Sequence, residues 1–159
     1  MILPIIAFGS PILRKKCEEI TVNYANLDTL LVNMWETMYN ASGVGLAAPQ
    51  INKAIRLFII DTTPFSEDTE SSKDQTIKQV FINPIILEET GDTWIFNEGC
   101  LSIPEIREDI SRKSSITIEY YDESFLKKRN VFDGLAARVI QHEYDHINGV
   151  LFTDKLSPL

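Results

Sequence analysis

The sequence predicts a single α+β domain, and three observations lead to this fold class. The chain has 159 residues, which suits one domain and leaves little room for a second hydrophobic core. Two segments, residues 26–41 and 133–148, show the spacing and the end signals that are typical of helices. The short apolar runs between them are close in sequence, which favours antiparallel pairing of strands.

The composition indicates a globular protein in a reducing compartment. Hydrophobic residues make up 44% of the chain and charged residues 24%, which argues against a disordered or membrane-spanning protein. The formal net charge of −8 disfavours general binding to nucleic acid or to anionic membranes. Two cysteines cannot form a disulfide scaffold, and the first residues lack the charge pattern of a secretion signal. We therefore expect a cytoplasmic protein.

The first helix is predicted over residues 26–41. Its apolar residues recur at helical spacing, at Leu27, Leu30, Leu31, Met34 and Met38. Asn26 can cap its start, and Gly43 can end it. The small residues that follow, at 43–50, predict neither a helix nor an ordinary strand, but backbone that a ligand approaches closely.

Strands are predicted at the short apolar runs. The first lies at residues 56–61 and should be buried, and the others lie at 80–82, 85–87, 93–96, 116–120 and 130–132. Residues 62–79 are rich in Ser, Thr, Asp, Glu and Lys, so we expect an exposed polar loop there.

The second helix carries the motif H-E-x-x-H. Asp133 can cap the helix and Gly149 can stop it. His142 and His146 are four residues apart, so both imidazoles can reach one metal ion from one face of a helix. Glu143 lies beside this face, where a carboxylate can take a proton from metal-bound water. The chain has only these two histidines, so any imidazole chemistry must use them.

The motif alone leaves several interpretations open. It arises by chance in unrelated proteins, where the two histidines are partners in the core, and it also fits other metallopeptidases or a binding module without activity. A catalytic metal needs a third protein ligand. Phe152 stands where metzincins need a third histidine, and Asp154 is the only carboxylate downstream for a thermolysin-like site. The best upstream candidate is Cys100, although a lone cysteine is more often a small buried apolar residue.

Three separated segments resemble the peptide deformylase family. They are G-x-G-x-A-A-x-Q at residues 43–50, E-G-C-L-S at 98–102 and Q-H-E-Y-D-H at 141–146. Their order and spacing fit the family, and the resemblance covers nearly the whole chain. It implies one deformylase-like catalytic domain over residues 1–159, with antiparallel strands packed around a central metal-bearing helix.

The resemblance also implies the metal site and the reaction. The reaction would be hydrolysis of a linear amide C–N bond, which removes the N-formyl group from the initiator formylmethionine and releases formate. Cys100, His142 and His146 would bind one divalent ion, Fe²⁺ in the cell, with Zn²⁺, Ni²⁺ or Co²⁺ able to substitute. Metal-bound water would attack the formyl carbon while Glu143 acts as general base and then as general acid.

The resemblance further implies an oxyanion site and an apolar pocket for the methionine side chain. The Gln50 side chain and the Leu101 N–H would stabilise the oxyanion. Val44, Phe96, Leu135 and Val139 match the pocket lining, Gly43 and Gly45 allow close backbone approach, and Arg107 matches a position near the substrate backbone. Glu98 and Arg138 match the wall or rim of the pocket, although position 138 is often apolar in the family.

The expected partners follow from the same resemblance. They are N-formylmethionyl peptides and nascent chains, with a transient contact at the ribosome that the negative net charge does not assist. We expect no specific nucleic-acid partner, no membrane contact and a monomeric state.

Overall fold

The computed structural model describes residues 1–67 and 76–156. It contains helices α1 (Leu27–Asn40) and α2 (Gly134–Ile147) and strands β1 (Gly45–Ala47), β2 (Leu57–Asp61), β3 (Lys78–Cys100), β4 (Ile103–Tyr121) and β5 (Lys127–Asp133). Short 3-10 helices lie at Pro11–Arg14, Ala48–Ile51, Thr63–Glu67 and Phe152–Lys155. The five strands form one antiparallel sheet in chain order, so the predicted α+β class with antiparallel strands is confirmed.

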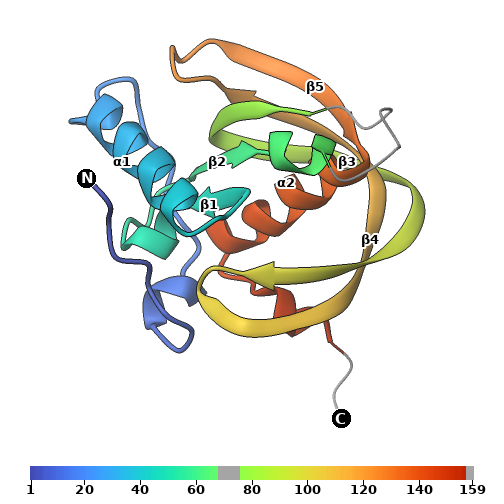
Figure 1. Cartoon of the computed structure of the whole chain (residues 1–159). Coiled ribbons are helices and arrows are strands. Elements are labelled where there is room, and N and C mark those ends of the chain that lie inside the picture. The colour runs from blue at the N-terminus through green and yellow to red at the C-terminus, as the bar shows by residue number, and fades with distance from the viewer. Residues whose placement is uncertain (68–75, 157–159) are drawn as a thin grey trace.

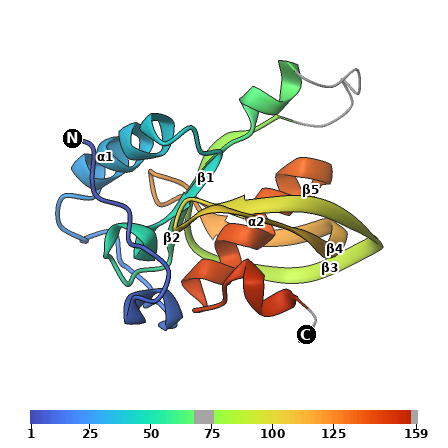
Figure 2. The same ribbon diagram turned by 60° about the horizontal axis from the view of Figure 1, so that its bottom comes forward.

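The long strands β3 and β4 curve around α2, while α1 lies outside the sheet (Figure 1). The second view shows the same enclosure of α2 by the strands (Figure 2). Strand β2 separates two hydrophobic clusters, because alternate side chains of a strand point to opposite faces. Phe58 and Ile60 belong to the cluster around α2, whereas Leu57 and Ile59 belong to the cluster under α1.

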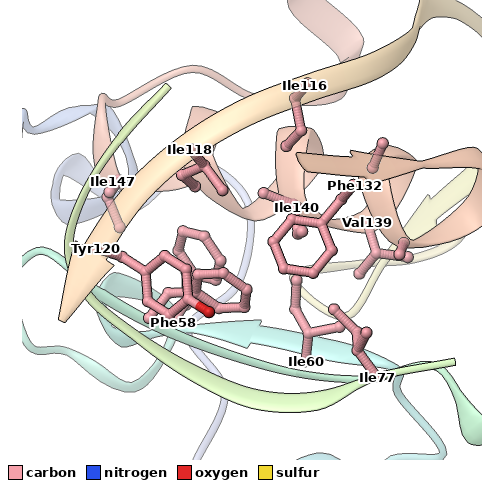
Figure 3. Close-up of a cluster of buried hydrophobic side chains, with 14 of the residues drawn as sticks. Phe58, Ile60, Ile77, Ile116, Ile118, Tyr120, Phe132, Val139, Ile140 and Ile147 are labelled. Carbon is pink, nitrogen blue, oxygen red and sulfur yellow. The ribbon is translucent and has the colours of Figure 1, made fainter. Parts of the chain in front are cut away.

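The cluster around α2 fixes the position of this helix (Figure 3). Ile140 and Ile147 of α2 lie among side chains from all five strands, including Phe58, Ile116 and Phe132. Burial of such a side chain stabilises the fold by about 1.5–3 kcal/mol. The apolar side of α2 therefore anchors the helix and sets where its polar residues lie.

Three of the predicted strands are parts of one element. Residues 80–82, 85–87 and 93–96 all belong to β3, which pairs along its length with β4. The register shifts between Ile82 and Ile85, next to Pro84, and again between Thr90 and Thr93. These irregularities and the polar residues between the apolar runs resemble strand ends in the sequence, but the strand continues through them.

Several predicted boundaries need correction. Gly45–Ala47 is a strand, because pairing with β2 overrides the weak strand preference of small residues. Asn26 and Asp133 do occupy the N-cap positions, but neither side chain makes a capping hydrogen bond. After α1 the residue with positive φ is Ser42 rather than Gly43, whereas Gly149 has the expected positive φ after α2.

The predicted polar loop at 62–79 is shorter than expected. Its first part forms the 3-10 helix Thr63–Glu67, and its last two residues belong to β3. Thr62 and Ile77 are buried and bond to each other, which closes the base of the segment. Residues 68–75 lie outside the described residues. Among the described residues, no helix is both long and apolar enough to cross a membrane.

Candidate metal centre

The second helix places both histidines against the end of β3. The Cys100 thiol and one ring nitrogen each of His142 and His146 lie within 4.8 Å of one another. The Cys100 Sγ is 3.3 Å from the His146 Nε2, and the two imidazole centroids are 5.1 Å apart. Cys100 is the last residue of β3, and a connection of only two residues leads to β4.

The three side chains fit a divalent metal ion. Metal–sulfur and metal–nitrogen bonds of about 2.3 and 2.1 Å in a tetrahedral site separate the two ligand atoms by about 3.5 Å. The observed 3.3 Å between Cys100 and His146 is close to this value. A thiolate with two imidazoles suits Zn²⁺, Fe²⁺ or Co²⁺. Three protein ligands leave a coordination position for water or substrate, as a catalytic site requires.

A buried carboxylate, Glu98, orients one of the histidines. Its Oε1 lies 2.9 Å from the His142 Nδ1, so the opposite ring nitrogen is left for the metal. Arg112 donates to both carboxylate oxygens, at 2.7 and 3.0 Å. Burial raises the pKa of Glu98, but hydrogen bonds from His142 and Arg112 outweigh this effect and lower the pKa to about 2. Glu98 is therefore a carboxylate at neutral pH.

Glu143 lies in a different environment. It is only 4% exposed, and its Oε1 has no hydrogen-bond partner among the described residues. Burial raises the pKa of Glu143 to about 7, against the opposing effect of His142. A carboxyl group with such a pKa can both accept and return a proton near neutral pH.

Gly45 makes room for Glu143. A Cβ at position 45 would lie 2.6 Å from the Glu143 Oε2, which is too close for any side chain. Position 43 is similarly tight, because a Cβ there would lie 2.7 Å from a methyl group of Leu101. The glycines of the small-residue segment therefore allow β1 to approach both α2 and the β3–β4 turn.

Gln50 points its amide nitrogen at the thiol. Its Oε1 accepts a hydrogen bond from the Ala47 N–H at 2.9 Å, which fixes the orientation of the amide. Its Nε2 then lies 3.6 Å from the Cys100 Sγ and 3.1 Å from the Ser102 Oγ. The amide N–H groups are thus held at the edge of the metal centre.

A cavity of about 490 Å³ opens beside the metal centre. The predicted site residues that line it are Val44, Gly45, Gln50, Phe96, Glu98, Cys100, Leu101, Arg107, Val139, His142 and Glu143. Arg138 also lines it, as predicted for the pocket wall. Leu135, on α2 one turn before Val139, and the predicted ligand His146 are not among the lining residues. Arg107 is held beside the cavity by bonds from its guanidinium to Asn97.

The structure adds residues that sequence reasoning missed. Phe65 lines the cavity although it lies in the predicted polar loop, where it is one of only two large apolar residues. Arg112 joins Glu98 to Asp145 of α2, at 2.7 and 2.8 Å. Strand alternation could have indicated Arg112, because it shares the inward face of β4 with Ile110 and Ile116.

Comparison with known proteins points to one family. The family model of polypeptide deformylase matches residues 2–159. The peptide deformylase of Flavobacterium psychrophilum is 59% identical over 99% of this chain and 84% of its own, and that of Cytophaga hutchinsonii is 47% identical. The crystal structure of peptide deformylase from Thermotoga maritima matches 99% of both chains at 39% identity, with a TM-score of 0.86.

A second solved structure agrees. It is a peptide deformylase from Synechococcus elongatus in complex with actinonin, 38% identical, with a TM-score of 0.87. The match covers 98% of this chain and 80% of that one.

Proposed function

The chain belongs to the polypeptide deformylase family, and we propose that it removes the formyl group from the initiator formylmethionine of newly made proteins. Members of this family are hydrolases that act on the N-formyl group of nascent peptides, so the protein is an enzyme. One observation supports the proposal most directly. The three potential metal ligands lie together, and two of them, Cys100 and His142, line one cavity with the buried Glu143.

The cavity is the proposed binding pocket for the methionine side chain. Val44 from the segment before β1, Phe96 of β3 and Val139 of α2 give the lining apolar surface. Its volume of about 490 Å³ lies in the range typical of small-ligand sites. In this proposal Arg107, on the exposed side, binds the substrate backbone.

The metal would be held by Cys100, His142 and His146. A divalent ion at this position lowers the pKa of bound water and polarises a carbonyl oxygen. The family resemblance leads us to propose Fe²⁺ as the ion in the cell. Zn²⁺, Ni²⁺ and Co²⁺ would be substitutes, because the donor set itself does not select one of these ions.

The protein's own side chains then move the proton and stabilise charge. Glu143 takes a proton from the attacking water and returns it to the departing amine, a role that its raised pKa supports. The Gln50 amide and the Leu101 N–H donate to the oxygen of the formyl group as negative charge develops on it. The bond from Ala47 keeps the Gln50 amide in place before substrate arrives, so little reorganisation is needed.

The proposal extends to the whole chain and its partners. Residues 1–159 act as one catalytic domain on formylmethionyl peptides and nascent chains in the cytoplasm. The enzyme works as a monomer that contacts the ribosome transiently, without specific binding to nucleic acid or membrane.

A formate-release assay tests the function. Protein loaded with Fe²⁺ without oxygen should release formate from a formylmethionyl tripeptide, and the metal-stripped protein should not. Metal-loaded protein without turnover would contradict the proposal. Cleavage of an internal bond in an unformylated peptide would identify another metallopeptidase, and tight binding without turnover would identify a binding module.

A further inference from the structure

Arg138 is an arginine buried in the wall of the site. It lies on α2 one turn before His142 and is only 1% exposed. Its Nη1 donates to the Glu98 Oε2 at 2.7 Å and to the Ile110 carbonyl at 2.9 Å. Its Nη2 donates to the Trp94 carbonyl at 2.6 Å, and its guanidinium carbon lies 4.6 Å from the centre of the Trp94 ring. Arg138 thus connects α2 to both long strands.

Burial of this cation is costly unless it is paired. Removing a guanidinium from water costs several kcal/mol, which only good geometry and a nearby anion offset. Glu98 is the one carboxylate among the described residues that pairs with Arg138. An apolar side chain of similar size would fill this position without that cost, so the charge itself needs an explanation.

Arg138 completes the set of donors around Glu98. The Oε1 accepts from Arg112 and lies against the His142 Nδ1, and the Oε2 accepts from Arg112 and Arg138. Each oxygen therefore has two partners, which uses the full acceptor capacity of a carboxylate. Without Arg138, the Oε2 would keep a single donor.

Arg112 also binds a second carboxylate, whereas Arg138 pairs with Glu98 alone among the described carboxylates. The Nη1 of Arg112 donates to Asp145 at 2.8 Å, so its guanidinium is shared between two carboxylates on different elements. Arg138 adds a second donor to the Glu98 Oε2, from helix α2. It limits the rotation of Glu98 that would move the Oε1 away from the His142 Nδ1.

We propose that Arg138 is a positioning residue of the metal site, which acts through Glu98 to fix the ring and tautomer of His142. An imidazole whose Nδ1–H is held by a carboxylate presents its other nitrogen to the metal in a fixed direction. The inference rests on the metal site of the proposed function. Two other roles for Arg138 make different predictions: a purely structural link between α2 and the strands, or a polar end of the substrate pocket.

The test measures Co²⁺ affinity of the metal-stripped protein by competition with a chelator. R138M, which keeps an unbranched stem without the charge, should bind Co²⁺ about 10-fold more weakly. This is the lower limit of the effect of losing a direct partner of a metal ligand, because Arg138 contacts that partner and not the ligand. Its Co²⁺ absorption spectrum should change as the ligand geometry loosens. R56M is the matched control: Arg56 is also buried but bonds to Ile147 and Asn148 rather than Glu98. R56M should keep Co²⁺ affinity within about twofold.

A double-mutant cycle separates positioning from structure. E98Q should weaken Co²⁺ binding, and adding R138M should then cost less than about threefold more, because the residue through which Arg138 acts has changed. R138K should restore part of the affinity lost in R138M, since its ammonium can still donate to Glu98. R138Q replaces R138M if that variant does not fold.

Three results would overturn the inference. They are wild-type Co²⁺ affinity in R138M, full additivity of R138M with E98Q, and no recovery in R138K. A change confined to KM for formylated peptides would instead assign Arg138 to the substrate pocket. The Co²⁺ titrations use no formylated peptide, so their result does not depend on deformylase activity. The inference about Arg138 and the proposed function can therefore fail independently of each other.

Discussion

The two helices have the same length of 14 residues but different surroundings. Helix α1 packs one face on the sheet, and its opposite face is exposed at Asp28, Val32 and Glu36. Every residue of α2, all of which the structure describes, is buried or half-buried. Figure 1 shows the reason, because the curved strands surround α2 but not α1.

The buried residues of the two helices also differ in chemistry. Those of α1 are apolar except Thr37, whose hydroxyl donates to the Asn33 carbonyl of the same helix. The buried residues of α2 include Arg138, Gln141, His142, Glu143 and His146. Most of these polar groups bond to β3 or β4 rather than to α2 itself. Helix α1 therefore contributes mainly stability. Helix α2 carries the candidate site residues and is anchored by its apolar side chains.

The largest effect is expected for Glu143→Ala, which removes the proposed proton-transfer group of α2. Proton transfer by a positioned side chain contributes about 10²–10⁴-fold, so formate release should fall by about that factor. Co²⁺ affinity should stay near that of the wild type, because Glu143 is not one of the three proposed ligands. Loss of Co²⁺ affinity together with activity would show that Glu143 helps to hold the metal.

Met34→Ala tests the other helix. Met34 lies on the buried face of α1 and is fully buried. Truncating such a side chain typically costs about 2–5 kcal/mol in free energy of unfolding. Denaturant unfolding measures this loss. The kcat/KM of the folded fraction should be unchanged, and a tenfold fall in it would contradict the division of roles between the helices.

The ion pairs of Glu98 with Arg112 and Arg138 predict that the stability of the fold depends on pH. Glu98 has a pKa of about 2 in the fold against an ordinary value of 4.5, so it binds fewer protons folded than unfolded in this range. Its stabilising effect is present above pH 4.5 and is lost as the pH falls towards 2. With a chelator present, the stability difference between wild type and E98Q should therefore shrink across this window. A difference that stays constant from pH 6 to 3 would contradict it.

The smallest effect is expected on the outer face of α1. Val32 is 55% exposed, and Val32→Gln should change the free energy of unfolding by no more than about 0.5 kcal/mol. Thermal unfolding and formate release should both match the wild type. A larger loss of stability would show that this face is covered in solution.

The two helices also show how far the sequence predicts the structure. Periodicity and end signals place both helices within one residue of their observed ends, although the expected side-chain caps are not formed. The apolar stripe of α1 is confirmed because one partner surface decides which residues are buried. On α2 the apolar periodicity does not predict all of the buried residues. Arg138 and Gln141 are polar, and they are buried because their partners lie on β3 and β4.

The site divides in the same way. His142, Glu143 and His146 follow from spacing on one helix, and Cys100 follows from the family resemblance. Their roles stay predictions, although the structure brings the side chains together. The bonds from Arg112 and Arg138 to Glu98 join β3, β4 and α2. No local pattern encodes such pairs, because they depend on how the strands curve around the helix.

The short turn between β3 and β4 has a consequence for the order in which the site is assembled. A ribosome makes Cys100 46 residues before His146, and the hairpin that carries the thiol can pair as soon as β4 has emerged. Contacts between neighbouring segments form early, whereas those between distant segments come late. The contacts between the Cys100 thiol and the two imidazoles therefore form only after α2 has been made and enclosed by the strands. An ion held by all three side chains can therefore bind only after α2 has docked against the β3–β4 hairpin, so such an ion marks a chain whose strands have closed around the helix.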